Sequence, residues 1–228
     1  VTKDGTIAGP RVLEHLVDVV LQVEGDRHTR LRLVRAAKNR YGAADEVGCF
    51  ELNDGGITGI SDPSGLFVSA QHEIVSGTCL TMTVEGTRPL LAEIQALVAA
   101  TNVPTPRRAT AGLDNARNAM ILAVLERRAG LALSRRDVHV ATVGGMRITE
   151  PAADLAVALA VTSAARDFAL PHSLIALGEV GLAGEVRRIA GLGRRLSEAA
   201  RLGVKDAIVP SNSGPYPKGI EVHEVGTV

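Results

Sequence analysis

The first sixty residues show the alternation of apolar and polar side chains that is typical of β-strands. In TRLRLVRAAKNR, the leucines are predicted to face one side of a strand and the arginines the other. The apolar runs VGCFEL and GITGI flank NDGG, which favours a hairpin turn. The first block is therefore predicted to be β-rich, and the turn residues of ISDPSGLF are predicted to end it.

The second block, which begins near Gly77, has strand-like and helix-like patterns in turn. TCLTMTVEG predicts a strand, and RPLLAEIQALVAA is predicted to form a helix because its apolar side chains fall on one helical face. These side chains are Leu90, Leu91, Ile94, Leu97 and Val98. TNVPTPRRAT is predicted to be a loop broken by proline. It leads to the helix NARNAMILAVLERRAG, which Asp114 is predicted to cap and Gly130 to end.

The same alternation continues to the end of the chain. DVHVATVGG predicts a strand, and Thr149 is predicted to cap the alanine-rich helix PAADLAVALAVTSAARD. LIALGEV and EVRRI flank the turn GLAG and predict a second hairpin, which is followed by the helix GRRLSEAARLG and the strands AIVP and IEVHEV. Strands and helices in turn predict an α/β or α+β domain.

Length and composition indicate a globular protein. The chain has 228 residues, of which 46% are apolar, enough for one large or two small domains. It has no long uncharged apolar run and no signal-peptide pattern, so we expect a cytoplasmic protein with no membrane partner. Cys49 and Cys79 are predicted to be buried thiols, although the sequence leaves a disulfide open.

Charge is balanced over the whole chain but not along it. The sequence has 25 Lys and Arg against 25 Asp and Glu, yet residues 105–205 have 15 against 9, a net charge of +6. Arginine supplies 21 of the 25 cations, and its planar fork suits phosphate. Five pairs of arginines are adjacent: Arg107-Arg108, Arg127-Arg128, Arg135-Arg136, Arg187-Arg188 and Arg194-Arg195. The alternative interpretation is an arginine-rich composition with solvated helix faces.

Common catalytic motifs are missing from the chain. It contains no GxxxxGK[ST], HExxH or GxSxG, and its six histidines have no metal-ligand spacing. The chain is therefore not expected to build a nucleotide cradle or a metal site on its own. One segment does concentrate charge: KNRYG, Lys38 to Gly42, places two cations around an asparagine at a predicted strand end. Taken alone, KNRYG is interpreted as a solvated strand end.

Several segments together resemble the bacterial RadA/Sms family of DNA repair proteins. They are VTKDGTIAGPRVLEH, LRLVRAAKNRYGAADEVGCFEL, TVEGTRPLLAEIQALV, VGGMRITEPAADLAVALAV and LGEVGLAGEVRRI, and they cover nearly the whole chain. The resemblance implies that residues 1–62 are the C-terminal, β-rich part of a RecA-like ATPase core and that 63–76 are a linker. Residues 77–228 would form a Lon protease-like (ribosomal protein S5 domain 2-like) α/β domain. It also implies a fragment, with the zinc finger and the Walker motifs before Val1 and a further segment after Val228.

The family resemblance implies that KNRYG acts at the interface between two subunits. The resemblance implies that Lys38 and Arg40 reach the terminal phosphate of ATP, bound with Mg²⁺ by the neighbouring subunit of a ring. Asn39 would fix the strand end and Gly42 would let the backbone turn. Tyr41 stands where the family usually has phenylalanine.

Further contacts are implied for DNA. Lys3 is the candidate in the segment TKDGTIAGP, which could equally be a plain connector. Arg107, Arg108 and Arg117 are the candidates in the Lon-like domain. Binding is expected to be electrostatic, because five aromatic residues offer few stacking platforms.

The resemblance also implies a protease-like domain without protease chemistry. Ala152 falls at the position of the Lon serine and Gly193 at that of its lysine, so peptidase activity is not expected. The predicted function is an ATP-dependent DNA repair and recombination protein. It would be a hexameric motor that promotes branch migration on single-stranded DNA and recombination intermediates, with the RecA recombinase as a partner. The alternative is a non-catalytic oligomerisation scaffold.

Overall fold

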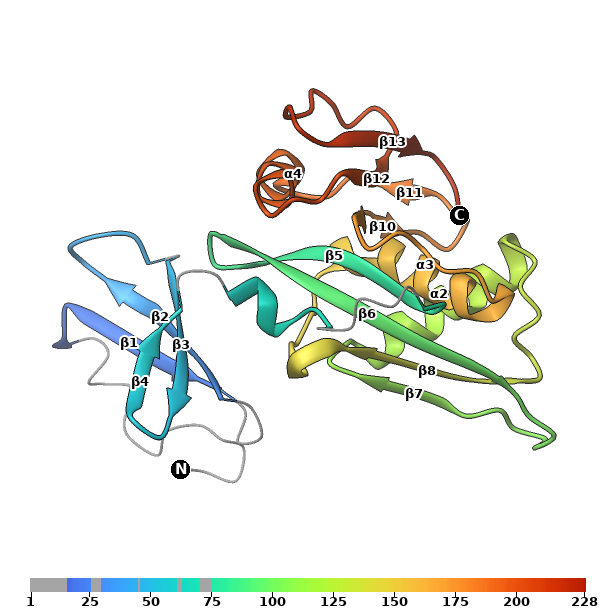
Figure 1. The fold of residues 1–228 in the computed structure, drawn as a ribbon, viewed down its shortest axis with the longest axis horizontal. Coiled ribbons are helices and arrows are strands. Elements are labelled where there is room, and N and C mark those ends of the chain that lie inside the picture. The colour runs from blue at the N-terminus through green and yellow to red at the C-terminus, as the bar shows by residue number, and fades with distance from the viewer. Residues whose placement is uncertain (1–15, 26–29, 45, 61–62, 70–74) are drawn as a thin grey trace. The chain divides into compact units, whose positions relative to one another are not determined.

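The chain divides into two compact units in the computed structural model, which describes residues 16–25, 30–44, 46–60, 63–69 and 75–228 (Figure 1). Unit 1 consists of Val1–Ser61 and Glu85–Arg88, and unit 2 of Asp62–Val84 and Pro89–Val228. Lys3, predicted to contact DNA, lies outside the described residues. No helix within the described ranges is long and apolar enough to cross a membrane.

Unit 1 is built on a four-stranded sheet in the order β1-β2-β3-β4, in which each pair of neighbours is antiparallel. The strands are β1 (Val19–Glu24), β2 (Leu31–Asn39), β3 (Val47–Asn53) and β4 (Gly56–Gly59). Between β3 and β4, the Gly55 N–H donates to the Asn53 side chain (3.0 Å), and Gly56 adopts a φ of 120° that other residues rarely reach. The β-rich first block and its NDGG hairpin are therefore confirmed.

Unit 2 is built on a mixed seven-stranded sheet in the order β13-β12-β9-β5-β6-β8-β7. Its strands are β5 (Thr78–Glu85), β6 (Arg88–Ala100), β7 (Arg108–Ala111), β8 (Arg136–Thr142), β9 (Leu174–Ala176), β12 (Asp206–Pro210) and β13 (Glu221–Val225). Strand β6 runs antiparallel to β8, whereas β7 runs parallel to β8 and β12 parallel to both β9 and β13. The predicted second hairpin is confirmed as β10 (Glu179–Val180) with β11 (Val186–Arg187).

The helices of unit 2 are α2 (Asn115–Arg128), α3 (Asp154–Arg166) and α4 (Leu192–Arg201), with 3₁₀ turns η1 (Pro63–Leu66), η2 (Val143–Gly145) and η3 (Pro151–Ala153). Helices α2 and α3 pack together against one face of the sheet (Figure 1). Helix α4 joins a separate core cluster, in which Leu196 packs with Met82 of β5 and Val209 of β12. The fold is therefore α/β, as predicted, and the sheet of unit 2 is mixed.

The predicted limits of α2 are confirmed. The Asp114 side chain accepts a hydrogen bond from the Arg117 N–H (2.7 Å), which is the contact expected of a helix N-cap. Gly130 follows the last turn with a φ of 67°, the left-handed conformation that ends many helices.

The helix predicted for residues 88–100 is wrong, because this segment forms the long strand β6. Leu90 to Ile94 are consecutive buried residues, so this part of the strand is covered on both faces and does not show the alternation of a half-exposed strand. The apolar residues of this strand are spaced as on one face of a helix, and this spacing led to the wrong prediction. Strand pairing with β8 outweighs the helix propensity of the Ala, Leu, Glu and Gln residues in this segment.

Two smaller predictions are also wrong. Thr149 does not cap α3, because the 3₁₀ turn η3 precedes the helix and Ala153 occupies its N-cap position without a side-chain hydrogen bond. The loop predicted around Arg108 contains the edge strand β7, four residues long. A strand this short gives too little alternation to detect in a sequence.

The segment before β5 is attached to the unit 2 sheet through a buried acid. Glu93 of β6 is 3% exposed, and its carboxylate accepts hydrogen bonds from the Ser69 N–H (2.8 Å) and the Ser69 hydroxyl (2.6 Å). Its backbone N–H donates to the Phe67 carbonyl (2.9 Å), and Phe67 is 2% exposed. Residues 67–69, within the range predicted to be a linker, therefore pack on unit 2.

Candidate functional site

The KNRYG segment lies where β2 ends, opposite the residue that precedes β1. Val19 pairs with Asn39 in the β1–β2 ladder, and the Arg40 N–H continues the pairing by donating to the Asp18 carbonyl (3.0 Å). The Arg40 guanidinium donates to Asp18 Oδ1 (3.1 Å), and the Tyr41 hydroxyl donates to Asp18 Oδ2 (2.9 Å). One carboxylate therefore contacts two side chains of the motif.

Asn39 and Gly42 shape the turn after β2. Asn39 Nδ2 donates to the Ala43 carbonyl (3.1 Å), and the Tyr41 N–H donates to Asn39 Oδ1 (3.1 Å). A Cβ added to Gly42 would come within 3.1 Å of Asn39 Nδ2, a tight contact. The asparagine closes a local turn of the kind that its short amide favours, and the glycine leaves room for it.

The charge of Arg40 lies largely in solvent. The Arg40 side chain is 73% exposed, and its hydrogen bond to Asp18, supported by that of Tyr41 and by the charge of Lys38, holds the pKa of Asp18 below its ordinary value. Asp18 is therefore ionised at neutral pH. No sequence pattern indicated Asp18, because only the strand register brings residues 18 and 40 together.

Arg107 and Arg108 lie at the start of β7, on the edge of the unit 2 sheet. The Arg107 N–H donates to Asp137 Oδ1 (2.7 Å) and its side chain is exposed. The Arg108 guanidinium donates to the carbonyls of Arg136 (2.5 Å) and Leu133 (2.7 Å). The two arginines are thus anchored beside the segment that enters β8.

Further arginines gather at the same end of unit 2. Arg135 and Arg136 stand at the start of β8, and the Arg136 guanidinium donates to the Ala165 carbonyl near the end of α3 (3.1 Å). The Arg166 guanidinium donates to the Ala129 carbonyl after α2 (3.3 Å). We call this set the arginine end: Arg107, Arg108, Arg127, Arg128, Arg135, Arg136 and Arg166. Over the described part of the chain, none of the seven forms an ion pair.

Arg117 is used differently. Its Nε donates to Asp154 Oδ1 (2.7 Å) and its Nη2 to Asp154 Oδ2, while Glu179 lies 3.5 Å away. The Asp154 side chain is 4% exposed and also accepts the Val180 N–H (3.0 Å). The hydrogen bonds with Asp154 raise the pKa of Arg117, so the guanidinium stays charged. The ion pair joins α2, α3 and β10.

Ala152 and Gly193 occupy very different environments. Ala152 lies in η3, is 3% exposed, and its carbonyl accepts the Gly178 N–H (2.9 Å). Gly193 is exposed in the first turn of α4, and a Cβ added there would meet nothing within 4 Å. Neither position carries a nucleophile or a base.

A buried ion pair lies two residues from each of those positions. The Arg195 guanidinium, 4% exposed, donates to both carboxylate oxygens of Glu150, at 2.7 Å for Oε1, and to the Met82 carbonyl (2.6 Å). Glu150 also accepts the Thr83 hydroxyl (2.8 Å) and the Val84 N–H (2.9 Å). The pair therefore crosslinks β5, α4 and the segment before η3.

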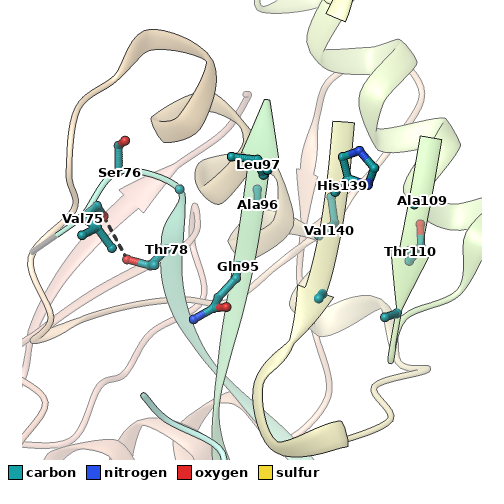
Figure 2. A pocket seen from close by; sticks show the side chains of 13 residues that line it. Val75, Ser76, Thr78, Gln95, Ala96, Leu97, Ala109, Thr110, His139 and Val140 are labelled. Carbon is teal, nitrogen blue, oxygen red and sulfur yellow. Dashed lines mark hydrogen bonds between the residues drawn. The ribbon is translucent and has the colours of Figure 1, made fainter. Parts of the chain in front are cut away.

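A groove with a volume of about 510 Å³ lies on the sheet of unit 2 (Figure 2). It runs over β6, β8 and β7, and its lining includes the exposed side chains of Gln95, Leu97 and His139. Its lining is mostly small or apolar, with Gln95 and His139 among its few polar side chains. None of the predicted site residues lines it.

Metal binding finds no support in the described part of the chain. No group of three His, Cys, Asp or Glu side chains converges there. Cys49 and Cys79 are both buried and unpaired, which confirms the prediction of two buried thiols. Burial raises the pKa of Cys79 to about 12, so its thiol is not reactive at neutral pH.

Comparison with known proteins identifies the family. Residues 122–213 match the model described as subunit ChlI of Mg-chelatase. The chain is 58% identical over 222 residues to the DNA repair protein RadA of Mycolicibacterium smegmatis, covering 97% of this chain and 47% of that protein. It is 56% identical over 228 residues to that of Mycobacterium tuberculosis (100% and 48%) and 45% identical over 231 residues to that of Bacillus subtilis (100% and 50%). The chain spans about half the length of these curated relatives. With matches that extend over nearly all of its residues in distant bacteria, the chain belongs to the RadA/Sms family.

Proposed function

We propose that this chain supplies two parts of an ATP-dependent DNA repair motor. KNRYG in unit 1 contacts ATP and Mg²⁺ held by a neighbouring subunit, and the arginine end of unit 2 binds the phosphates of DNA. Residues 1–62 then belong to a RecA-like core, 63–76 link it to the second domain, and 77–228 form a Lon protease-like domain. The assembled protein is a cytoplasmic hexameric ring that drives branch migration alongside the RecA recombinase.

The arginine end is the observation that carries the DNA-binding part of this proposal. Seven arginines from four segments lie at one end of unit 2, and no carboxylate of the described residues pairs with their guanidinium groups. Backbone carbonyls hold the guanidinium groups of Arg108, Arg136 and Arg166 in place. Fixed, unneutralised arginines are suited to the bidentate recognition of phosphate. The small number of aromatic residues favours binding that tolerates any sequence.

Arg117 has a different role in this proposal from the one expected of it. Its guanidinium is bidentate to the buried Asp154, so a DNA phosphate would have to break an ion pair inside the fold. We therefore assign Arg117 to the joint between α2, α3 and β10, and assign the DNA contacts to Arg107, Arg108 and the rest of the arginine end.

The ATP-binding part of the proposal follows from the exposure of KNRYG. Lys38 and Arg40 are cations at a strand end, and Arg40 is mostly in solvent, so its guanidinium is available to a second subunit. The chain has no Walker motif, and the nucleotide must therefore be held mainly by other residues. Cations that reach the phosphates from a neighbour stabilise the negative charge that develops during phosphoryl transfer.

The protease-like half acts as a scaffold in this proposal. The places of the serine and the lysine hold Ala152 and Gly193, and the Glu150–Arg195 pair beside them is part of the core. The alternative function, an oligomerisation scaffold without motor activity, shares this feature. The two proposals differ in whether the function requires contacts of this chain with DNA and ATP, and variants that lack these contacts separate the two.

The DNA surface is tested by removing three exposed arginines whose side chains form no hydrogen bond with the described residues. We expect the variant carrying Arg127→Ala, Arg128→Ala and Arg135→Ala, made in the full-length protein, to bind single-stranded DNA more weakly. Each lost phosphate contact should lower the slope of log K against log salt by about 0.7, so the total change should be about 2. The measurement is fluorescence anisotropy titration at several salt concentrations.

A matched variant carries the same charge change elsewhere on unit 2. Arg147→Ala, Arg188→Ala and Arg194→Ala remove three exposed arginines outside the arginine end. We expect this variant to keep the affinity and the salt slope within error. Equal losses in both variants would show a general effect of net charge and would contradict the assignment of the arginine end, as would an unchanged salt slope in the first variant.

A further inference from the structure

The KNRYG segment has an internal partner that the proposed function does not use, the carboxylate of Asp18. Both oxygens of Asp18 are occupied, Oδ1 by the Arg40 guanidinium (3.1 Å) and Oδ2 by the Tyr41 hydroxyl (2.9 Å). Its backbone carbonyl accepts the Arg40 N–H (3.0 Å). The same residue therefore holds both the backbone and the side chain of Arg40.

The side-chain contact is the weaker of the two and lies in solvent. The Arg40 side chain is 73% exposed and the Asp18 side chain 45%. Exposed ion pairs of this kind are weak and are screened by salt. A phosphate group offers the same guanidinium a doubly hydrogen-bonded, charge-assisted contact, which is stronger. A phosphate can therefore displace Asp18 from Arg40 without disturbing the core.

We propose that Asp18 is a displaceable counter-ion, which holds the Arg40 guanidinium at the end of β2 until a nucleotide phosphate takes it. This inference rests on the proposed contact between KNRYG and ATP. Because the carboxylate competes for Arg40 and repels an anion, Asp18 weakens the binding of ATP at this segment. It thereby favours release of the guanidinium after each turnover.

Tyr41 and the backbone make the exchange local. When the guanidinium leaves, the Arg40 N–H still donates to the Asp18 carbonyl, so the strand end stays paired. Asp18 Oδ2 keeps its hydrogen bond from the Tyr41 hydroxyl, because Arg40 contacts the other carboxylate oxygen, Oδ1. Only the arginine side chain has to move.

The test is Asp18→Asn in the full-length protein with DNA bound. Asparagine keeps the shape of the side chain and can still accept the Tyr41 hydroxyl, but it removes the charge. We expect the Kd for a non-hydrolysable ATP analogue with Mg²⁺ to fall about two- to fivefold, the range that an exposed ion pair accounts for. The KM for ATP should fall in parallel, with a smaller effect on kcat.

The control is the same change in an Arg40→Gln background. Because Asp18 is proposed to act through Arg40, the gain in affinity should be lost there. A gain of equal size in both backgrounds would mean that only the net charge matters, and the inference would be wrong. A weaker affinity in the Asp18→Asn protein would also overturn it, since Asp18 would then be needed to build the site.

The failure of this inference differs from the failure of the proposed function. If Lys38→Ala and Arg40→Gln both leave DNA-stimulated ATP hydrolysis unchanged, KNRYG does not contact ATP, and both proposals are overturned. If these two variants lose turnover while Asp18→Asn leaves the Kd and KM unaltered, only the counter-ion role of Asp18 is overturned.

Discussion

Replacing Arg195 by alanine is expected to lower the free energy of unfolding of unit 2 by about 3 kcal/mol, the low end of the roughly 3–5 kcal/mol range for breaking a buried pair. The low end applies because the Glu150 side chain is 27% exposed, so water can reach part of the abandoned carboxylate. The Met82 carbonyl also loses its donor. Thermal unfolding should show a midpoint lower by about 6–12 °C for a unit of this size.

Arg194→Ala provides the matched control for Arg195→Ala. Arg194 precedes Arg195 on α4 but is exposed, so its loss should change the stability by no more than about 0.5 kcal/mol. If the two substitutions destabilised the protein equally, the loss of stability would come from weakening helix α4 and not from breaking the ion pair.

The contribution of this pair should depend on pH. Burial alone would raise the pKa of Glu150, but the hydrogen bonds from Arg195 and Thr83 outweigh it and leave the pKa below its ordinary value of 4.5. An acid whose pKa is lowered in the folded state stabilises the fold above its unfolded-state pKa and loses that contribution as the pH falls through the folded-state pKa. The difference between the natural chain and Arg195→Ala should therefore be full at neutral pH and shrink in acid.

Sequence patterns correctly predicted the elements that depend on residues close together in the chain. The strand in TRLRLVRAAKNR, the NDGG turn and the Asp114 cap each depend on residues a few positions apart, and each is confirmed. Strand β6 was missed because its consecutive buried residues depend on what covers both faces of the sheet. Such burial is a property of the tertiary structure and leaves no period of two in the sequence.

The same distinction applies to the site residues. The chemistry proposed for KNRYG rests on five consecutive residues and a family resemblance. Its partner Asp18, and the pairs Arg117–Asp154 and Glu150–Arg195, join residues 22, 37 and 45 positions apart. Arginine is the commonest cation in this sequence, so no pattern tells a structural guanidinium from one that faces DNA. Only burial and hydrogen-bond partners separate Arg195 and Arg117 from the arginine end.

The largest effect is expected from the cations of KNRYG. In the full-length protein, Arg40→Ala is expected to lower the kcat of DNA-stimulated ATP hydrolysis on the order of 10³-fold, as loss of an arginine that stabilises phosphoryl transfer does elsewhere. Lys38→Ala should also lower kcat, but by a smaller factor, because Arg40 still reaches the phosphate in this variant. DNA affinity should be retained in both variants, because the proposed DNA surface lies in unit 2.

Two further measurements decide whether these cations act between subunits. Arg30→Ala removes an exposed arginine just before β2, at the far end of the strand from KNRYG, and should leave kcat within about twofold because it makes no phosphate contact. Mixing Arg40→Ala subunits with subunits that cannot bind ATP should restore part of the turnover, because each kind then supplies what the other lacks at a shared interface. A mixture as inactive as its components, under conditions where the subunits exchange, would place Arg40 at the site of its own subunit and contradict the intersubunit role. Unchanged turnover in Arg40→Ala alone would leave the oligomerisation scaffold as the better account of the chain.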